Sequence, residues 1–229
     1  TPLYSSAASD VYKRQTFRSA NMAHTEFVGM PLRPSIVALA TKKDPASARK
    51  HFGLRPDQFT LLVTGGSLGA RSINQTIESS RPLLAAAGIQ VLHIVGGSSE
   101  LEEVSEAQYA RVRYLDQMEL AIASSDFAVS RAGAATVSEF SAVGLPALYI
   151  PYPVGNGEQK FNLQDVLAAG GAVTISDSEF TPEYVRSTLI PMLSDSKALN
   201  QMSESAKQAG VLDGTERFIA LIDEVLVRK

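Results

Sequence analysis

The sequence predicts an α/β domain built as a Rossmann-like parallel sheet with helices on both faces. Apolar runs such as 59–64 and 89–95 have the length of strands and lack polar alternation, as strands buried on both faces do. A helical segment at 70–86 separates these two runs, with Ile77 and Leu84 at helical spacing. Strands that alternate with helices indicate a parallel sheet covered on both sides.

The remaining elements continue this alternation to the end of the chain. The predicted strands are 112–115, 127–130, 147–150 and 172–175. The predicted helices are 117–124, 134–143, 158–169 and 182–194, followed by two terminal helices at 196–209 and 215–227. These segments carry the parallel-sheet prediction through the whole C-terminal part.

The N-terminal part reads differently from this α/β pattern. Residues 1–15 are small and polar without periodicity, which predicts a disordered or non-native tail; whether it is translated vector sequence or a native tail stays open. Residues 16–57, punctuated by prolines, are expected to form an interdomain linker and the start of the domain, with one short helix at 46–52. The α/β domain itself is then expected over 58–229.

Composition excludes several classes of function. With 21 Lys and Arg against 24 Asp and Glu, the chain has no basic excess for a nucleic-acid partner. It has no cysteine, and its three histidines do not stand at metal-ligand spacing, so neither a disulfide, a metal nor a cofactor is expected. The longest apolar run, 83–95, is too short and too interrupted to span a membrane.

A glycine-rich turn follows the first predicted strand of the domain. In Gly65-Gly66-Ser67-Leu68-Gly69, glycines allow a tight turn, and the Ser67 hydroxyl with the helix N–H groups can hold a phosphate. The sequence is neither a Walker A nor a dinucleotide fingerprint, so a purely structural turn remains an equal alternative.

A second set of polar residues lies on the helix predicted at 134–143. Arg131 comes just before the helix and could meet a phosphate or a base carbonyl, unless it is an ordinary surface arginine. Glu139 lies further along the helix, where a carboxylate can accept two hydrogen bonds from a ribose diol. The alternative for Glu139 is an exposed helix residue without a ligand.

A third set opens the helix predicted at 158–169. Glu158, Gln159 and Asn162 stand at helical spacing on one face, so they can converge on a polyol such as a sugar. Asn156 before them is better explained as the cap of that helix. His93 lies inside a strand and is expected to be a hydrogen-bonded core residue.

Taken together, these motifs resemble the MurG family of peptidoglycan N-acetylglucosaminyltransferases, which have the GT-B fold. The resemblance covers about residues 20–228, is most similar to the actinobacterial branch, and identifies only the C-terminal, donor-binding half. It is carried by the segments 30–33, 65–71, 114–115, 130–144 and 157–162.

The resemblance implies a role for each matching position. Those positions are Arg33, Ser67, Leu115, Arg131, Ala134, Ala135, Glu139, Glu158, Gln159 and Asn162. It implies that Arg33 and Ser67 contact the diphosphate, and that the backbone at Leu115 reads the uracil, with Arg131 nearby. Ala134 and Ala135 would face the diphosphate and GlcNAc, and Glu139 the ribose. Gln159 and Asn162 would bind GlcNAc hydroxyls, as would Glu158, which stands where many members have Gln.

The activity implied is an inverting transfer of GlcNAc from UDP-GlcNAc to lipid I, giving lipid II for the cell wall, without a metal or cofactor. The catalytic residue is unknown, because the base is expected in an N-terminal half that this chain lacks. That half would also bind lipid I and contact the cytoplasmic side of the cell membrane, so the chain alone is expected to be inactive. Two alternatives remain: another GT-B UDP-sugar enzyme, either an epimerase or a transferase, and a non-catalytic nucleotide-binding domain.

Overall fold

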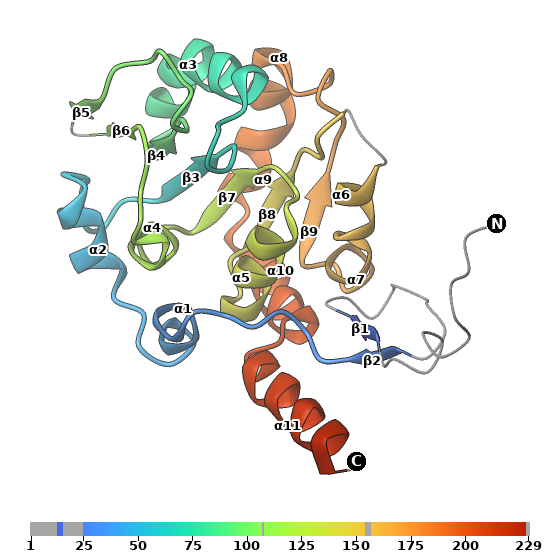
Figure 1. Cartoon of the computed structure of the whole chain (residues 1–229). Coiled ribbons are helices and arrows are strands. Elements are labelled where there is room, and N and C mark those ends of the chain that lie inside the picture. Colours follow the sequence, from blue (N-terminus) through green and yellow to red (C-terminus); the bar gives the residue numbers. More distant parts are fainter. Residues whose placement is uncertain (1–12, 16–24, 107, 154–156, 228–229) are drawn as a thin grey trace.

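A seven-stranded sheet forms the centre of the protein in the computed structural model, which describes residues 13–15, 25–106, 108–153 and 157–227 (Figure 1). Its strand order is β5-β6-β4-β3-β7-β8-β9. The strands are β3 (Thr60–Thr64), β4 (Gln90–Ile94), β5 (Val104–Glu106), β6 (Tyr109–Val112), β7 (Phe127–Ser130), β8 (Ala147–Tyr149) and β9 (Ala172–Thr174). All neighbours pair in parallel except β5, which runs antiparallel to β6 at one edge. The Rossmann-like α/β prediction is confirmed, and the antiparallel edge strand is an addition to it.

Helices cover both faces of this sheet (Figure 1). One face carries α3 (Arg71–Ala86), α8 (Pro182–Tyr184), the π-helical segment η2 (Val185–Leu189) and α9 (Ile190–Ser194). The other carries α1 (Pro34–Leu39), α4 (Met118–Ser124), α5 (Ala134–Val143) and α7 (Gln164–Ala168). The helix α2 (Pro45–His51) packs against α4, and α6 (Glu158–Phe161) precedes α7. Near the C-terminus, α10 (Ser196–Ala209) contributes to both cores, and α11 (Gly214–Val227) follows it.

The two-sided burial explains why the strands are continuously apolar. Side chains alternate across a strand, so Leu61 and Val63 of β3 enter one core while Leu62 enters the other. All three are fully buried. A polar residue at any of these positions would face a helix rather than water, which is why no alternation is seen in the sequence.

Some predicted elements differ from the structure. The strand expected at 112–115 is found at Tyr109–Val112. The prediction was displaced because the buried, charged Arg111 interrupts the apolar pattern of this strand. The helix expected at 158–169 is two short helices, interrupted at Asn162 and Leu163. The helix expected at 182–194 is continuous but contains the π-helical segment.

The N-terminal region has more structure than expected. Lys13–Gln15 forms the strand β1, which pairs in parallel with β2 (Thr25–Phe27), so the predicted tail is not wholly without regular structure; its residues 1–12 lie outside the described part. In the predicted linker, α1 begins with Pro34 at its first turn and buries Ile36 completely. The predicted cap at Asn156 also lies outside the described residues.

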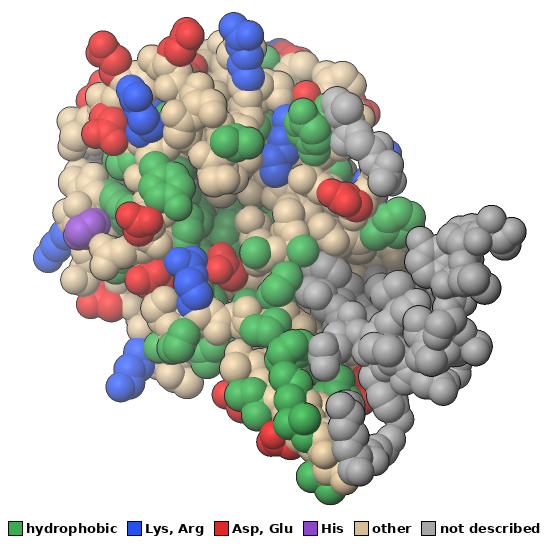
Figure 2. Space-filling view, in the orientation of Figure 1, with side chains coloured by type: hydrophobic (Ala, Val, Ile, Leu, Met, Phe, Trp, Pro, Cys, Tyr) green, Lys and Arg blue, Asp and Glu red, His purple; other side chains and the backbone are tan. Residues whose placement is uncertain are grey.

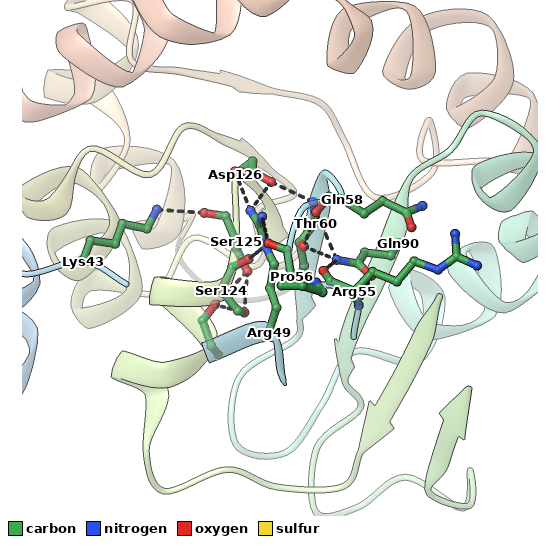
Figure 3. A network of polar contacts seen from close by, with 11 residues as sticks. Lys43, Arg49, Arg55, Pro56, Gln58, Thr60, Gln90, Ser124, Ser125 and Asp126 are labelled. Atoms are coloured by element: carbon green, nitrogen blue, oxygen red, sulfur yellow. Dashed lines mark hydrogen bonds and ion pairs between the residues drawn. The ribbon is translucent and has the colours of Figure 1, made fainter. Parts of the chain in front are cut away.

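The amino ends of the central strands are tied together by a polar network (Figure 3). Arg49 of α2 donates from one guanidinium nitrogen to both carboxylate oxygens of Asp126, at 2.9 and 2.7 Å, and from Nε to the carbonyl of Ser124 at 2.8 Å. The Asp126 carboxylate also accepts the backbone N–H of Thr60 at 2.7 Å. These contacts join α2, β3 and β7 at the amino edge of the sheet.

The C-terminal helix α11 carries apolar side chains that stay exposed. Apolar side chains gather along it on the face shown in Figure 2, and Ile219, Leu226 and Val227 are among the exposed large hydrophobic residues. Leu221 on the same helix is buried. None of the described helices is long and apolar enough to cross a membrane.

Candidate functional site

The loops that carry the predicted site residues leave neighbouring strands at one edge of the sheet. Thr64 at the end of β3 is the register partner of Ser130 at the end of β7, and Ser130 is the partner of Tyr149 in β8. In open α/β sheets, ligands bind beyond these carboxyl ends. The strand register therefore brings together the glycine-rich loop, the start of α5 and the loop that leads to α6.

The glycine-rich loop is held by close packing against the turn that follows β4. Gly69 has a φ of +84°, and a Cβ placed on it would lie 2.1 Å from the carbonyl oxygen of Val95. The backbone N–H of Gly97 donates to the carbonyl of Ser67 at 2.8 Å. Ser67 itself is exposed. Only glycine permits this approach, and it leaves the Ser67 hydroxyl at the surface.

The N-terminus of α5 is open to an anion. Its N-cap residue, Gly133, offers no side-chain hydrogen bond, and its first turn contains no acidic residue. The first N–H groups of a helix lack intrahelical partners, and the helix dipole adds a partial positive charge there. Ala134 and Ala135, predicted to face the diphosphate, are the first two residues of this helix. A phosphate is well matched to this arrangement.

Gln159 and Asn162 lie beside this helix start. The backbone N–H of Ala132 donates to Oε1 of Gln159 at 3.2 Å, and Nδ2 of Asn162 donates to the carbonyl of Ala132 at 2.9 Å. The same oxygen of Gln159 accepts the N–H of Tyr152 at 2.8 Å. The two amides thus converge on backbone groups, and their contact with a sugar stays a prediction. Glu158 is exposed.

Arg33 and Glu139 form an ion pair on the side of α5. One guanidinium nitrogen of Arg33 lies 3.2 Å from Oε1 of Glu139, and the other donates to the carbonyl of Asp116 at 3.1 Å. The Glu139 side chain is only 14% exposed, whereas that of Arg33 is 46% exposed. Leu115 precedes Asp116 and packs against the core. The structure therefore pairs two predicted residues, Arg33 and Glu139, and joins Arg33 to the residue that follows a third, Leu115.

Arg131 is enclosed by protein rather than presented to solution. Its guanidinium lies 2.5 Å from the carboxylate of Asp177 and donates to the carbonyl of Ile150 at 3.1 Å and to the hydroxyl of Ser72 at 3.1 Å. Its Nε is buried without a hydrogen-bond partner. Asp177 was not among the predicted site residues, although its position just after the last strand places it at this edge.

A buried polar cluster supports the turn against which the glycine-rich loop packs. Nδ2 of Asn74 donates to the carbonyl of Val95 at 2.9 Å, and Oδ1 of Asn74 lies 3.0 Å from Nε2 of His93. Nδ1 of His93 lies 2.6 Å from the hydroxyl of Tyr109, which bonds to the Glu78 carboxylate. His93 is fully buried, so its prediction as a hydrogen-bonded core residue is confirmed.

The electrostatics of this cluster follow from burial and pairing. Burial lowers the pKa of His93, and the hydrogen bond to the negatively charged Glu78 carboxylate opposes this only in part. For Glu78, burial is the largest single influence and raises the pKa, but the bonds to His93, Tyr109 and Arg111 together outweigh it and lower the pKa to about 2. Neutral His93 beside ionised Glu78 is the resulting state near pH 7. Among the described residues, no group of three or more His, Cys, Asp or Glu could hold a metal ion.

The sequence itself decides the family. Residues 60–218 match the glycosyltransferase family 28 C-terminal domain. The chain belongs to this family. Family 28 relatives include a protein of Leifsonia xyli named UDP-N-acetylglucosamine–N-acetylmuramyl-(pentapeptide) pyrophosphoryl-undecaprenol N-acetylglucosamine transferase. It is 50% identical over 206 residues, which cover 90% of this chain and 58% of the relative. A Streptomyces coelicolor protein of the same name is 43% identical over 214 residues, covering 92% of this chain and 59% of the relative.

A solved structure shows the same fold. The crystal structure of Acinetobacter baumannii MurG superposes with a TM-score of 0.72 at 21% identity, over 93% of this chain and 60% of that one. The predicted fold, the C-terminal domain of a GT-B glycosyltransferase, and the resemblance to MurG are therefore confirmed. The chain spans about 58% of the length of its Leifsonia relative.

Proposed function

We propose that this chain binds UDP-GlcNAc as the donor part of an N-acetylglucosaminyltransferase. The observation that carries the proposal is the open N-terminus of α5 at the carboxyl edge, with Glu139 five residues further along the same helix. A rise of about 1.5 Å per residue puts Glu139 about 7.5 Å from the helix start, a suitable spacing for a ribose next to a diphosphate. The names of the relatives at 43–50% identity agree with this donor.

The three parts of the UDP moiety then each have a partner. The diphosphate lies at the N–H groups of Ala134 and Ala135 with the Ser67 hydroxyl, and the ribose diol donates to the Glu139 carboxylate. The uracil edge meets the backbone at Leu115. Arg33 holds Glu139 on one oxygen in the described structure, which leaves the second oxygen for the ribose.

We further propose the reaction that the relatives' names describe, with an N-acetylmuramyl-(pentapeptide) pyrophosphoryl-undecaprenol as acceptor. The acceptor hydroxyl attacks the anomeric carbon, its proton passes to a base, and the bond to the UDP oxygen breaks. The helix N–H groups stabilise the negative charge that develops on the leaving UDP. The base belongs to the part of the longer relatives that this chain does not cover. We propose that the reaction takes place at the cytoplasmic face of the cell membrane, in which the polyprenyl chain of the acceptor would be embedded, and that it needs neither a metal nor a nucleic acid.

Calorimetric titration with UDP tests the donor assignment. Glu139→Ala should weaken UDP binding at least tenfold, because hydrogen bonds to a charged group contribute about 1.5–3 kcal/mol. Glu183→Ala is the matched control, since it removes an exposed glutamate of α8 whose carboxylate pairs with Arg186. Unchanged UDP affinity in the Glu139 variant, with its thermal midpoint retained, would refute the ribose assignment.

A further inference from the structure

Ala132 lies in the gap between β7 and α5, where no regular structure satisfies its backbone. The strand ends at Ser130 and the helix begins at Ala134, so neither the sheet ladder nor the helix supplies partners for the N–H and the carbonyl of Ala132. Ala132 is fully buried. A buried backbone group without a partner costs about 1–3 kcal/mol, so these two groups require side-chain partners.

Gln159 and Asn162 supply both partners. Oε1 of Gln159 accepts the N–H of Ala132 at 3.2 Å, and Nδ2 of Asn162 donates to its carbonyl at 2.9 Å. Gln159 lies in the first turn of α6, and Asn162, three residues later, is the C-cap of this helix. The position of α6 and the position of the chain just before α5 are therefore coupled.

The coupling extends to the loop after β8. The Oε1 that accepts Ala132 also accepts the N–H of Tyr152 at 2.8 Å. Among the described residues, Nε2 of Gln159 makes no hydrogen bond. Of the two polar atoms of this side chain, Nε2 is therefore the one available to a ligand. One amide thus fixes two loops at the carboxyl edge of the sheet.

We infer that Gln159 and Asn162 are positioning residues for the diphosphate site, acting through Ala132 on the N-terminus of α5. The inference rests on the proposed function. The residue after Ala132 is Gly133, the helix N-cap, which lacks a side-chain cap of its own. The two hydrogen bonds on Ala132, which we call the Ala132 clamp, therefore act two residues before Ala134, where the N–H groups that receive the diphosphate begin. Such groups must be placed to within fractions of an ångström to act on a phosphate.

This role differs in its consequences from a direct sugar contact. A side chain that only touches GlcNAc contributes to binding of UDP-GlcNAc and contributes nothing to binding of UDP. A side chain that places the diphosphate site contributes to both ligands equally. The ratio of the two affinities in a variant therefore separates the roles.

The experiment is a calorimetric titration of Gln159→Ala and Asn162→Ala with UDP and with UDP-GlcNAc. Each variant should lose about tenfold in affinity for both ligands, corresponding to about one hydrogen bond to a buried group. The double variant should lose less than the product of the single losses, because both side chains act on the same residue. Gln164→Ala, an exposed glutamine of the next helix, is the matched control and should bind both ligands as the parent does.

A second measurement keeps the inference testable if the alanine variants fold poorly. Gln159→Met keeps the side-chain volume and removes the acceptor, so the amide hydrogen of Ala132 should exchange faster than in the parent, without any ligand present. Loss of affinity for UDP-GlcNAc alone, or unchanged exchange at Ala132, would overturn the positioning role. Failure of the parent protein to bind UDP would instead overturn the proposed function. The exchange rate of the Ala132 amide hydrogen would then decide by itself whether Gln159 restrains this residue.

Discussion

Replacing Asp126 with alanine should destabilise the protein by about 3 kcal/mol, because it leaves a buried guanidinium without its counter-charge. The Arg49 side chain is 9% exposed, and breaking a buried ion pair costs about 3–5 kcal/mol. The lower end applies for two reasons. Asp126 is 34% exposed, so water can enter the vacated space, and Arg49 keeps its bonds to the carbonyls of Ser124 and Pro56.

The same change removes the acceptor of a buried backbone group. The N–H of Thr60 donates to the Asp126 carboxylate at 2.7 Å, and Thr60 is fully buried. Asp126→Asn retains an amide oxygen for this N–H but not the charge, so its loss should be about 2 kcal/mol, between those of the parent and the alanine variant. Glu183→Ala, which breaks an ion pair with both side chains more than 60% exposed, should change stability by no more than about 0.5 kcal/mol.

Urea denaturation at pH 7, followed by circular dichroism, measures these differences as shifts of the midpoint at constant slope. UDP affinity of the folded Asp126→Ala protein should equal that of the parent, because the network lies at the amino edge of the sheet (Figure 3). An Asp126→Ala variant no less stable than the Glu183→Ala control would refute the reasoning.

Two further predictions concern the Arg33 pair and the buried histidine. Arg33→Lys should weaken UDP binding about three- to tenfold in calorimetry, because an ammonium cannot reach both Glu139 and the Asp116 carbonyl as the guanidinium fork does. The free energy of unfolding of this variant should change by no more than about 0.5 kcal/mol, since Arg33 is 46% exposed. If the variant lost as much free energy of unfolding as of UDP binding, the role of Arg33 in positioning Glu139 would be contradicted. Because burial lowers the pKa of His93 below 6.5, the unfolded chain takes up a proton that the folded chain does not, so stability falls as pH drops below 6.5. The loss reaches at most about 2 kcal/mol by pH 5, and His93→Gln should remove it; the same pH slope in that variant would show the reasoning to be wrong.

The parts of the fold that local physics determines were predictable from the sequence. The helix α5 was predicted with the bounds it has, because Gly133 precedes it and Gly144 ends it with a φ of +70°. The strand β7 was likewise predicted with its observed bounds, since its four residues are buried on both faces and bounded by polar positions. Such elements depend on residues close together in the chain, which a reader of the sequence can see.

The elements that were missed depend on partners far away in the chain. Arg111 can lie in β6 because its guanidinium forms an ion pair with Glu78 of α3 at 2.6 Å. The residues near Arg111 in the sequence do not predict this pairing. The helix expected at 158–169 is interrupted at Asn162, whose side chain bonds to the backbone of Ala132. Contacts between residues thirty or more positions apart form only when the domain folds. The hydrophobic periodicity of the sequence therefore does not predict them.

The candidate site shows the same division, and this has a consequence for binding. Sequence motifs identified the residue types at the carboxyl edge, but the structure shows that Arg131, Glu139 and Gln159 are already held by other protein groups. Side chains that are fixed before a ligand arrives lose little entropy when it binds, which raises affinity without a new contact. The donor then meets groups that remain open, which include the α5 N–H groups, the second oxygen of Glu139, the Ser67 hydroxyl, the backbone at Leu115 and Nε2 of Gln159. Variants that loosen the surrounding contacts should therefore weaken UDP binding, even where the altered side chain never touches the nucleotide.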